Sequence, residues 1–171
     1  MNISPFIYIA SPLGFSEVGR KWYYEELIPM LKEIGFEILD PWELTPLSVI
    51  EKATKFPYGI ERKSAWKEVN RTIGRNNERG ITKSDFILAI LDGVDVDSGT
   101  ASEIGYGYAK GKIVIGYRGD FRLSADNEGS TVNLQVEWFI YDSEGKIVTS
   151  FHDLTEEMIN QYNHFQASKQ L

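Results

Sequence analysis

With 171 residues, of which 42% are hydrophobic, the chain is long enough for one globular domain with a buried core. Its net charge of −7 argues against binding a nucleic-acid polymer through its phosphates. The absence of cysteine excludes disulfides and thiolate chemistry, and the two histidines, both near the C-terminus, make a histidine metal site unfavourable. We find no membrane-length apolar run and no signal peptide, and we expect a cytoplasmic protein that uses neither metal nor cofactor and does not contact a membrane.

The first third of the chain predicts a strand, a helix and a second strand. Residues 6–10 form a short apolar run between prolines, which is typical of a strand. A helix follows from about residue 17 to residue 34, and Gly35 provides its C-terminal stop. Residues 36–39 form the second strand, so this unit is βαβ and the sheet is expected to be parallel.

The middle of the chain predicts a helical region and then a second βα unit. Residues 44–83 are rich in charge and mostly helical, with a break at 55–59. An apolar strand at 85–91 and a helix at 100–110 follow, and then another strand at 112–117.

The last third is less regular. Residues 118–130 form a long polar loop, and such loops are usually functional or disordered. Residues 133–141 fit either a strand or a helix, 146–151 a weak strand, and 154–166 a helix. We therefore predict one α/β domain over residues 1–171, with about five mostly parallel strands between two layers of helices.

The stretch after the 85–91 strand carries the most chemical information. The chain turns through Asp92-Gly93, passes Asp97 and a Ser98-Gly99 bend, and enters a helix at Thr100 with Glu103 in its first turn. A buried strand followed by a polar loop and a helix start builds a ligand site at the carboxyl edge of a parallel sheet. We expect the carboxylates of Asp92, Asp97 and Glu103 to converge there.

Glu103 has two interpretations. Thr100-x-x-Glu103 matches a capping box, in which the glutamate side chain only stabilises the helix start. Its place at the carboxyl edge and the proximity of Asp97 favour a catalytic role instead. A helix N-terminus favours an ionised glutamate, which suits a nucleophile that attacks a sugar.

Several other side chains are predicted to lie at the same edge. Tyr8 lies near the end of the first strand, where it is either a half-buried packing residue or part of the site. Phe15 and Trp42 follow the first two strands, and loop aromatics there can stack on a flat base or simply anchor the loops. Asn76 and Asn77 are placed at the end of a charged helix, where a C-cap is the structural alternative.

Other nucleotide-binding motifs are not supported. The glycines in residues 105–111 fall inside or after the helix, so they indicate close helix–sheet packing and not a dinucleotide site. The sequence also contains neither a P-loop nor a serine nucleophile elbow.

The motif of residues 91–106 resembles the nucleoside 2-deoxyribosyltransferase family. It reads Leu-Asp-Gly, then Asp97-Ser-Gly-Thr-x-x-Glu103-x-Gly-Tyr. The resemblance extends from about residue 6 to residue 140 and includes Tyr8-Ile-Ala-Ser-Pro and Asn133-Leu-Gln135. It implies a flavodoxin-like doubly wound sheet and transfer of 2-deoxyribose between nucleobases, with net retention.

The resemblance also implies roles for single residues. Glu103 matches the nucleophile that attacks C1′, Tyr8 the residue that positions it, and Asp97 the aspartate that holds the deoxyribose near the leaving base. Asn133 and Gln135 match groups that a neighbouring subunit supplies, which implies a dimer-based homo-oligomer with shared active sites. The expected substrates are a deoxynucleoside and a free nucleobase. The full set of expected substrate-binding residues is Phe15, Trp42, Asn77, Asp92, Gly99, Asn133 and Gln135.

One position departs from the family pattern. Where the family has an aspartate that contacts the base, this chain has Asn77 or, if the alignment shifts by one residue, Glu78. Two alternatives to the transferase stay open: a deoxynucleoside 5′-monophosphate N-glycosidase, and a nucleotide-binding module in which Glu103 only caps its helix.

Overall fold

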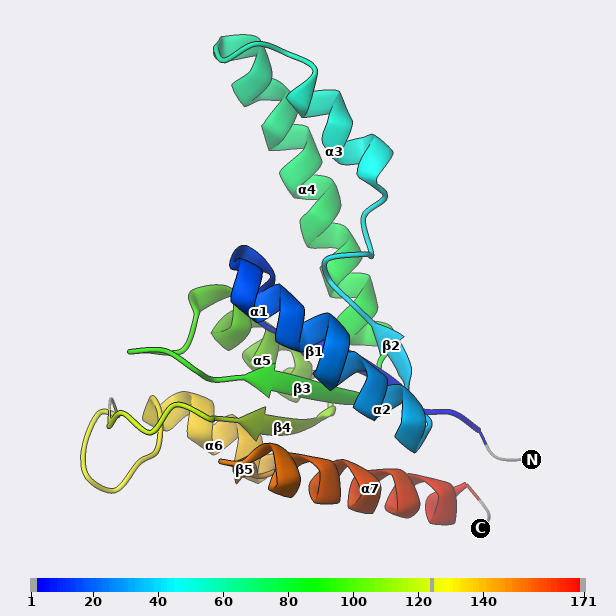
Figure 1. Cartoon of the computed structure of the whole chain (residues 1–171), viewed down its shortest axis with the longest axis vertical. Helices are drawn as coiled ribbons and strands as arrows, with labels where there is room; N and C mark the ends of the chain where they lie inside the picture. The colour runs from blue at the N-terminus through cyan, green and yellow to red at the C-terminus, as the bar shows by residue number, and fades with distance from the viewer. Residues whose placement is uncertain (1–2, 124, 170–171) are drawn as a thin grey trace.

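The computed structural model describes residues 3–123 and 125–169 and has an α/β fold (Figure 1). The elements in chain order are β1 (Phe6–Ala10), η1 (Leu13–Phe15), α1 (Glu17–Trp22), η2 (Tyr23–Leu27), α2 (Ile28–Ile34), β2 (Glu37–Leu39), α3 (Leu47–Thr54), α4 (Ile60–Lys83), β3 (Phe86–Ile90), α5 (Ser98–Ala109), β4 (Ile113–Tyr117), α6 (Leu134–Asp142), β5 (Ile147–Val148) and α7 (Phe151–Ser168). No helix among these residues is both long enough and apolar enough to cross a membrane.

The five strands form one parallel sheet in the order β2-β1-β3-β4-β5. This is the flavodoxin-like, doubly wound order, in which the chain direction across the sheet reverses between β1 and β3. The predicted fold class is therefore confirmed. The central strand β3 is buried along its whole length, which explains its uninterrupted apolar sequence.

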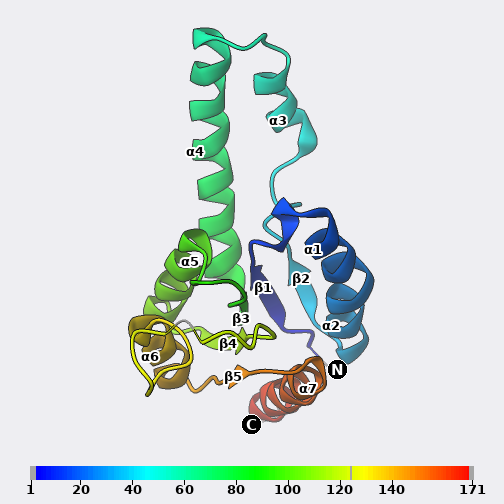
Figure 2. The same ribbon diagram turned by 60° about the vertical axis from the view of Figure 1, so that its left-hand side comes forward.

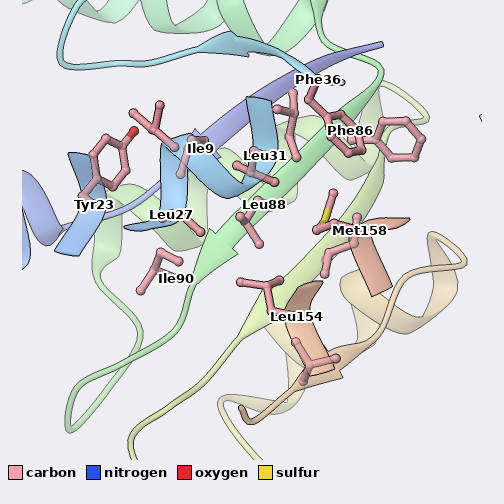
Figure 3. Packing of buried hydrophobic residues seen from close by; sticks show 14 residues of the cluster. Ile9, Tyr23, Leu27, Leu31, Phe36, Phe86, Leu88, Ile90, Leu154 and Met158 are labelled. Atoms are coloured by element: carbon pink, nitrogen blue, oxygen red, sulfur yellow. The ribbon is translucent and has the colours of Figure 1, made fainter. Parts of the chain in front are cut away.

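Different helices cover the two faces of the sheet. Successive strand residues point to opposite faces, so neighbouring residues of one strand join different apolar clusters. Ile7 and Leu88 face one cluster that includes residues of α2 and α7, shown in Figure 3. Tyr8 and Ile87 face the other cluster, to which α4, α5 and α6 contribute. Figure 2 shows α4, α5 and α6 grouped on one side and α1 and α2 on the other.

Residues 133–141, which fit strand or helix by sequence, are helical. The Asn133 side chain accepts hydrogen bonds from the backbone N–H groups of Gln135 and Val136, so it caps α6. Val136 and Ile140, one helical turn apart, are buried against the sheet. Of the strand predicted at 146–151, only the two residues of β5 are formed, and Phe151 already begins α7. The predicted loop at 118–130 is confirmed except at position 124, which lies outside the described residues.

The 17–34 helix is continuous but contains the π-helical segment η2 at its centre. Gly107 in α5 lies so close to β3 that a Cβ there would be 1.9 Å from Ile87 Cδ1. The interpretation of this glycine as a residue of close helix–sheet packing is confirmed.

Helices α3 and α4 leave the sheet together and form a projecting arm (Figures 1 and 2). We use "the arm" for residues 47–83. The predicted break at 55–59 is the turn between the two helices. Only the C-terminal part of α4 packs on the body, where Gly80 approaches the Tyr8 ring and Ile81 joins the core.

Candidate active site

The start of α5 differs from the prediction. The helix begins at Ser98, and the Asp97 carboxylate caps it by accepting a hydrogen bond from the Thr100 backbone N–H at 3.0 Å. Glu103 therefore lies beyond the first turn, and the capping-box interpretation of Thr100 and Glu103 is wrong. Asp97 already occupies the capping position, so the Glu103 side chain is available for other contacts.

The Glu103 carboxylate instead meets Tyr8 from β1. The Tyr8 hydroxyl donates a hydrogen bond of 2.6 Å to Glu103 Oε1, a length typical of a hydroxyl bonded to a carboxylate. Asn77 from α4 lies on the same oxygen, with its Nδ2 at 3.5 Å. Both contacts end on Oε1, so Oε2 faces neither of these donors.

Burial controls the electrostatics of this pair. Desolvation raises the pKa of Glu103 above its ordinary value, and the charge of Asp97 adds to this effect. The hydrogen bonds from Tyr8 and Asn77 act in the opposite direction and lower that pKa. The net shift is upward, so the helix N-terminus, whose dipole acts mainly within the first turn, does not dominate the pKa of Glu103.

Tyr8 is completely buried beneath the site. Burial raises the pKa of its phenol far above the ordinary range, and the neighbouring Glu103 carboxylate adds to this. The phenol therefore stays protonated and acts as a hydrogen-bond donor to Glu103. The Tyr8 ring thus packs in the core while its hydroxyl contacts Glu103, which lines the cavity described below.

A cavity of about 540 Å³ opens beside Glu103. It lies at the carboxyl edge of the sheet, and its lining comes from the loops after β1, β2 and β3, from the arm and from α5. The lining residues are Ser11, Phe15, Pro41, Trp42, Thr45, Ile50, Trp66, Asn70, Ile73, Asn77, Asp97, Gly99, Thr100 and Glu103. The predicted residues Phe15, Trp42, Asn77, Asp97, Gly99 and Glu103 are among them.

Aromatic rings form part of this lining. Phe15 and Trp42 contact each other edge to face, with ring centroids 4.8 Å apart. Trp42 is held from both sides: Asp40 accepts a hydrogen bond from its backbone N–H at 3.0 Å, and Gly14 lies so close that a Cβ there would be 2.1 Å from the indole ring. Tyr23 in turn donates a hydrogen bond of 2.9 Å to Asp40. Buried Asp40 thus holds the Trp42 backbone, and buried Gly14 lies against the indole ring.

Helix α4 supplies three lining residues that sequence reasoning missed. They are Trp66, Asn70 and Ile73, which recur with the predicted Asn77 at spacings of four, three and four, so all four share one face of α4. Trp66 and Ile73 were visible in the sequence as an apolar helical pattern. That pattern alone does not distinguish a face that packs on a core from one that lines a cavity.

The position of Asn77 settles two of the sequence alternatives. Asn76 and Asn77 lie inside α4, which continues to Lys83, so the C-cap interpretation is wrong. Asn77 faces the cavity, whereas Glu78 accepts a hydrogen bond from Tyr106 on another side of the helix. Asn76 donates to the carbonyl oxygen of Leu44 and thereby fastens the loop after β2 to the arm.

Three of the predicted substrate-binding residues do not line the cavity. The Asp92 carboxylate accepts a hydrogen bond of 2.9 Å from the backbone N–H of Asp120, so it joins two loops and does not converge with Asp97 and Glu103. Asn133 is used as the cap of α6, and Gln135 follows it in the first turn of that helix. Within one chain, neither side chain reaches the cavity.

The site offers hydrogen-bonding and stacking groups but no evident metal ligands. Within residues 3–123 and 125–169, no group of three histidine, cysteine, aspartate or glutamate side chains is placed to hold a metal ion. The described lining also contains no lysine or arginine. It combines aromatic rings, two asparagines and the carboxylates of Asp97 and Glu103.

These features define a flavodoxin-like protein in which a buried tyrosine is paired with a half-buried glutamate at the carboxyl edge of its sheet. The family model described as nucleoside 2-deoxyribosyltransferase matches residues 7–135. The chain belongs to the nucleoside 2-deoxyribosyltransferase family. No curated protein sequence matches the chain.

Solved structures share the fold over most of the chain. A conserved protein from Enterococcus faecalis V583 is 25% identical, with a TM-score of 0.71, over 93% of this chain and 99% of the other. A 2-deoxyribosyltransferase from Leishmania mexicana is 23% identical, with a TM-score of 0.62, over 91% and 97%. A CMP N-glycosidase from Clostridium botulinum is 18% identical, with a TM-score of 0.52, over 92% and 98%.

Proposed function

We propose that this protein transfers 2-deoxyribose from a deoxynucleoside to a second nucleobase through a covalent intermediate on Glu103. The observation that carries the proposal is the 2.6 Å hydrogen bond from the buried Tyr8 hydroxyl to Glu103 Oε1 at the cavity. A buried donor that does not ionise holds the carboxylate in one orientation and leaves Oε2 directed at a substrate. Family membership supports this class of chemistry.

The proposed reaction has two displacements at the anomeric carbon. Oε2 of Glu103 attacks C1′ as the C1′–N bond breaks, and the base leaves with the bonding electron pair and takes up a proton. A nitrogen of the second base then attacks C1′, releases Glu103 and loses a proton. Two inversions give net retention. Because the sugar lacks a 2′-hydroxyl, it supports positive charge at C1′ easily.

The remaining lining residues are assigned by chemistry. Asp97 uses Oδ2 to cap α5, which leaves Oδ1 to hold the deoxyribose near the leaving base. Phe15, Trp42 and Trp66 provide flat surfaces against which a base can stack. Asn77 can hydrogen-bond a base edge, but it cannot act as a carboxylic acid toward the leaving group.

The lining favours a neutral nucleoside over a nucleotide. A monophosphate needs a compensating cation or a cluster of donors, and the described cavity residues include no lysine or arginine. The N-glycosidase alternative, in which water takes the sugar from a deoxynucleoside monophosphate, therefore has less support from the site.

We further propose that a second copy of the chain completes the site. Asn133 and Gln135 lie outside the cavity of their own chain, and Gln135 is exposed at the start of α6. Their supply by a neighbouring subunit would make the functional protein a homo-oligomer.

A transfer assay tests the reaction. Purified protein is incubated with 2′-deoxyinosine and adenine, with thymidine as a second donor, and without any acceptor; products are separated by chromatography. Deoxyadenosine formed faster than base is released without acceptor supports the transferase. Fast base release that ignores the acceptor identifies a hydrolase. No product from deoxynucleosides or deoxynucleoside monophosphates, with ligand binding retained, identifies a binding module.

A further inference from the structure

Asp40 is a buried carboxylate that the proposed reaction does not use. It directly follows β2 and is only 4% exposed. Its Oδ1 accepts hydrogen bonds from the Tyr23 hydroxyl at 2.9 Å and from the backbone N–H of Trp42 at 3.0 Å. Its Oδ2 accepts one from the Tyr24 hydroxyl at 3.2 Å. A buried charge without partners is costly, so these three donors determine where the carboxylate lies. We call Tyr23, Tyr24 and Asp40 the tyrosine clamp.

The two tyrosines of the clamp are neighbours in sequence, and the π-helical segment η2 begins at Tyr23. Neighbouring residues of a regular α-helix point in directions about 100° apart, so they do not normally face one partner. Here the two rings contact each other edge to face, with centroids 5.0 Å apart, and both hydroxyls reach Asp40. π-helical segments are frequent at functional sites. The local distortion of this helix therefore coincides with the clamp.

Both phenols of the clamp stay protonated at neutral pH. Burial, with the charge of Asp40 as the second cause, raises the pKa of Tyr24 to about 12. The same two causes raise the pKa of Tyr23 far above the ordinary range. The Tyr23 side chain is also part of the apolar cluster shown in Figure 3, which fixes its ring. The clamp therefore presents fixed donors to Asp40.

The clamp connects this buried group to the wall of the cavity through Trp42. The Trp42 side chain lines the cavity, and the residue remains 36% exposed although Phe15 and Gly14 pack against its ring. Arg20, four residues before Tyr24 and on the same side of the helix, donates a hydrogen bond of 3.0 Å to the carbonyl oxygen of Gly14. The indole is thus held at its backbone and against its ring. A surface that is ordered before its ligand arrives loses little freedom on binding, and this raises affinity.

We propose that Asp40 is a positioning residue that sets the affinity of the site for a nucleobase by holding the Trp42 indole in its stacking orientation. Among the described residues, Asp40 is not part of the cavity lining, so it acts through Trp42. The inference rests on the proposed function for the class of ligand, a nucleobase, but does not require the transfer reaction. It gives the clamp a role separate from that of Tyr8 and Glu103, which act at the sugar.

Binding of a free base, measured by titration calorimetry without a sugar donor, tests this role. The probes are adenine and thymine, and the one that the wild type binds more tightly is used for all variants. Asp40→Ala removes every acceptor of the clamp, and Tyr24→Phe removes only the hydrogen bond to Oδ2. Asp40→Asn is the conservative variant: its amide oxygen can accept from Tyr23 and Trp42, and its amide nitrogen can donate to the Tyr24 hydroxyl. Trp42→Ala, alone and combined with Asp40→Ala, completes a double-mutant cycle.

Glu157→Ala is the matched control. Glu157 is also a buried carboxylate, 5% exposed, which accepts a hydrogen bond of 2.7 Å from Gln161 and forms an ion pair with Lys146. Lys146 directly precedes β5, at the opposite edge of the sheet from β2. The control should lose thermal stability without losing base affinity. A purely structural role for Asp40 would make Asp40→Ala behave in the same way.

We expect Trp42→Ala to raise the Kd for the base by about 5- to 100-fold, the range for loss of one stacking contact. Asp40→Ala should raise it by at least about threefold and Tyr24→Phe by about twofold or more, because the ring loses its support. Asp40→Asn should restore an affinity close to that of the wild type. The double variant should bind the base as weakly as Trp42→Ala alone and no more weakly, since the clamp acts only through this ring.

Several outcomes would overturn the proposal. They are unchanged affinity in folded Asp40→Ala, additive losses in the double variant, an equal loss of affinity in Glu157→Ala, and a wild type that binds neither base. If Asp40→Ala does not fold, unchanged affinity in Tyr24→Phe would have the same meaning. The expected affinities without any transfer activity would refute the proposed reaction and leave the role of Asp40 supported, so the two failures are distinguishable.

Discussion

Replacing Tyr8 by phenylalanine removes one hydroxyl from beneath Glu103 and nothing else. Tyr8 is completely buried and its hydroxyl lies 2.6 Å from Oε1, so the substitution leaves the half-buried carboxylate of Glu103 with only the long contact to Asn77. A hydrogen bond to a charged group contributes about 1.5–3 kcal/mol. If this contribution acts in the transition state, kcat/KM falls by roughly 10- to 150-fold.

The pH dependence of Tyr8→Phe separates a catalytic role from a packing role. The Tyr8 hydrogen bond lowers the pKa of Glu103 against the raising effect of burial, so its loss raises that pKa further. In the proposed reaction, Glu103 must be ionised to attack C1′, so activity is lost as the pH falls through its pKa. The acid limb of the kcat/KM profile should therefore move to higher pH in the variant.

Tyr23→Phe is the matched control for this experiment. It also removes a hydroxyl from a buried tyrosine that donates to a carboxylate, but the acceptor is Asp40 and the Tyr8–Glu103 contact stays intact. We expect a similar loss of thermal stability in both variants and a displaced acid limb only in Tyr8→Phe. The reasoning is refuted if Tyr8→Phe keeps the wild-type profile, or if both variants displace the limb equally.

Three further substitutions test other parts of the site. Glu103→Gln should reduce transfer by at least about a thousandfold. It should also raise the thermal stability at neutral pH. Folding raises the pKa of Glu103, so the ionised side chain destabilises the folded protein above that pKa, and this destabilisation disappears in acid. A variant that is less stable than the wild type at neutral pH would contradict this account. Asn77→Asp should change the preference among purine and pyrimidine bases more than the overall rate, and equal rates for both proteins across a base panel would count against it. Gly14→Ala should displace the Trp42 indole, because the added Cβ would lie 2.1 Å from that ring. We expect KM to rise by about 5- to 100-fold, with a smaller effect on kcat. An unchanged KM would show that this ring does not contact the base.

Local patterns in the sequence determined most of the fold. The uninterrupted apolar run before Asp92 identified the central strand, and the βαβ order of the first 40 residues required a parallel sheet. Turn residues and apolar spacing located nearly every helix, because both signals arise from neighbours within one or two turns of chain. The ambiguity at 133–141 was resolved only by the sheet that buries Val136 and Ile140.

The sequence by itself also identified Glu103, Asp97 and Tyr8 as candidates and, through the family motif, the class of chemistry. Only the tertiary structure decided how they meet. Tyr8 and Glu103 are 95 residues apart, and Asn77 and Glu103 are 26 apart, so their contacts depend on strand order and on the path of α4. The same reason explains the error at Asp92, which is drawn to the backbone of Asp120, 28 residues away. The error in the cap of α5 was local, because Asp97, three residues before Thr100, takes the cap assigned to Thr100. A sequence pattern reports which face of an element is apolar or polar, but the fold decides what that face meets.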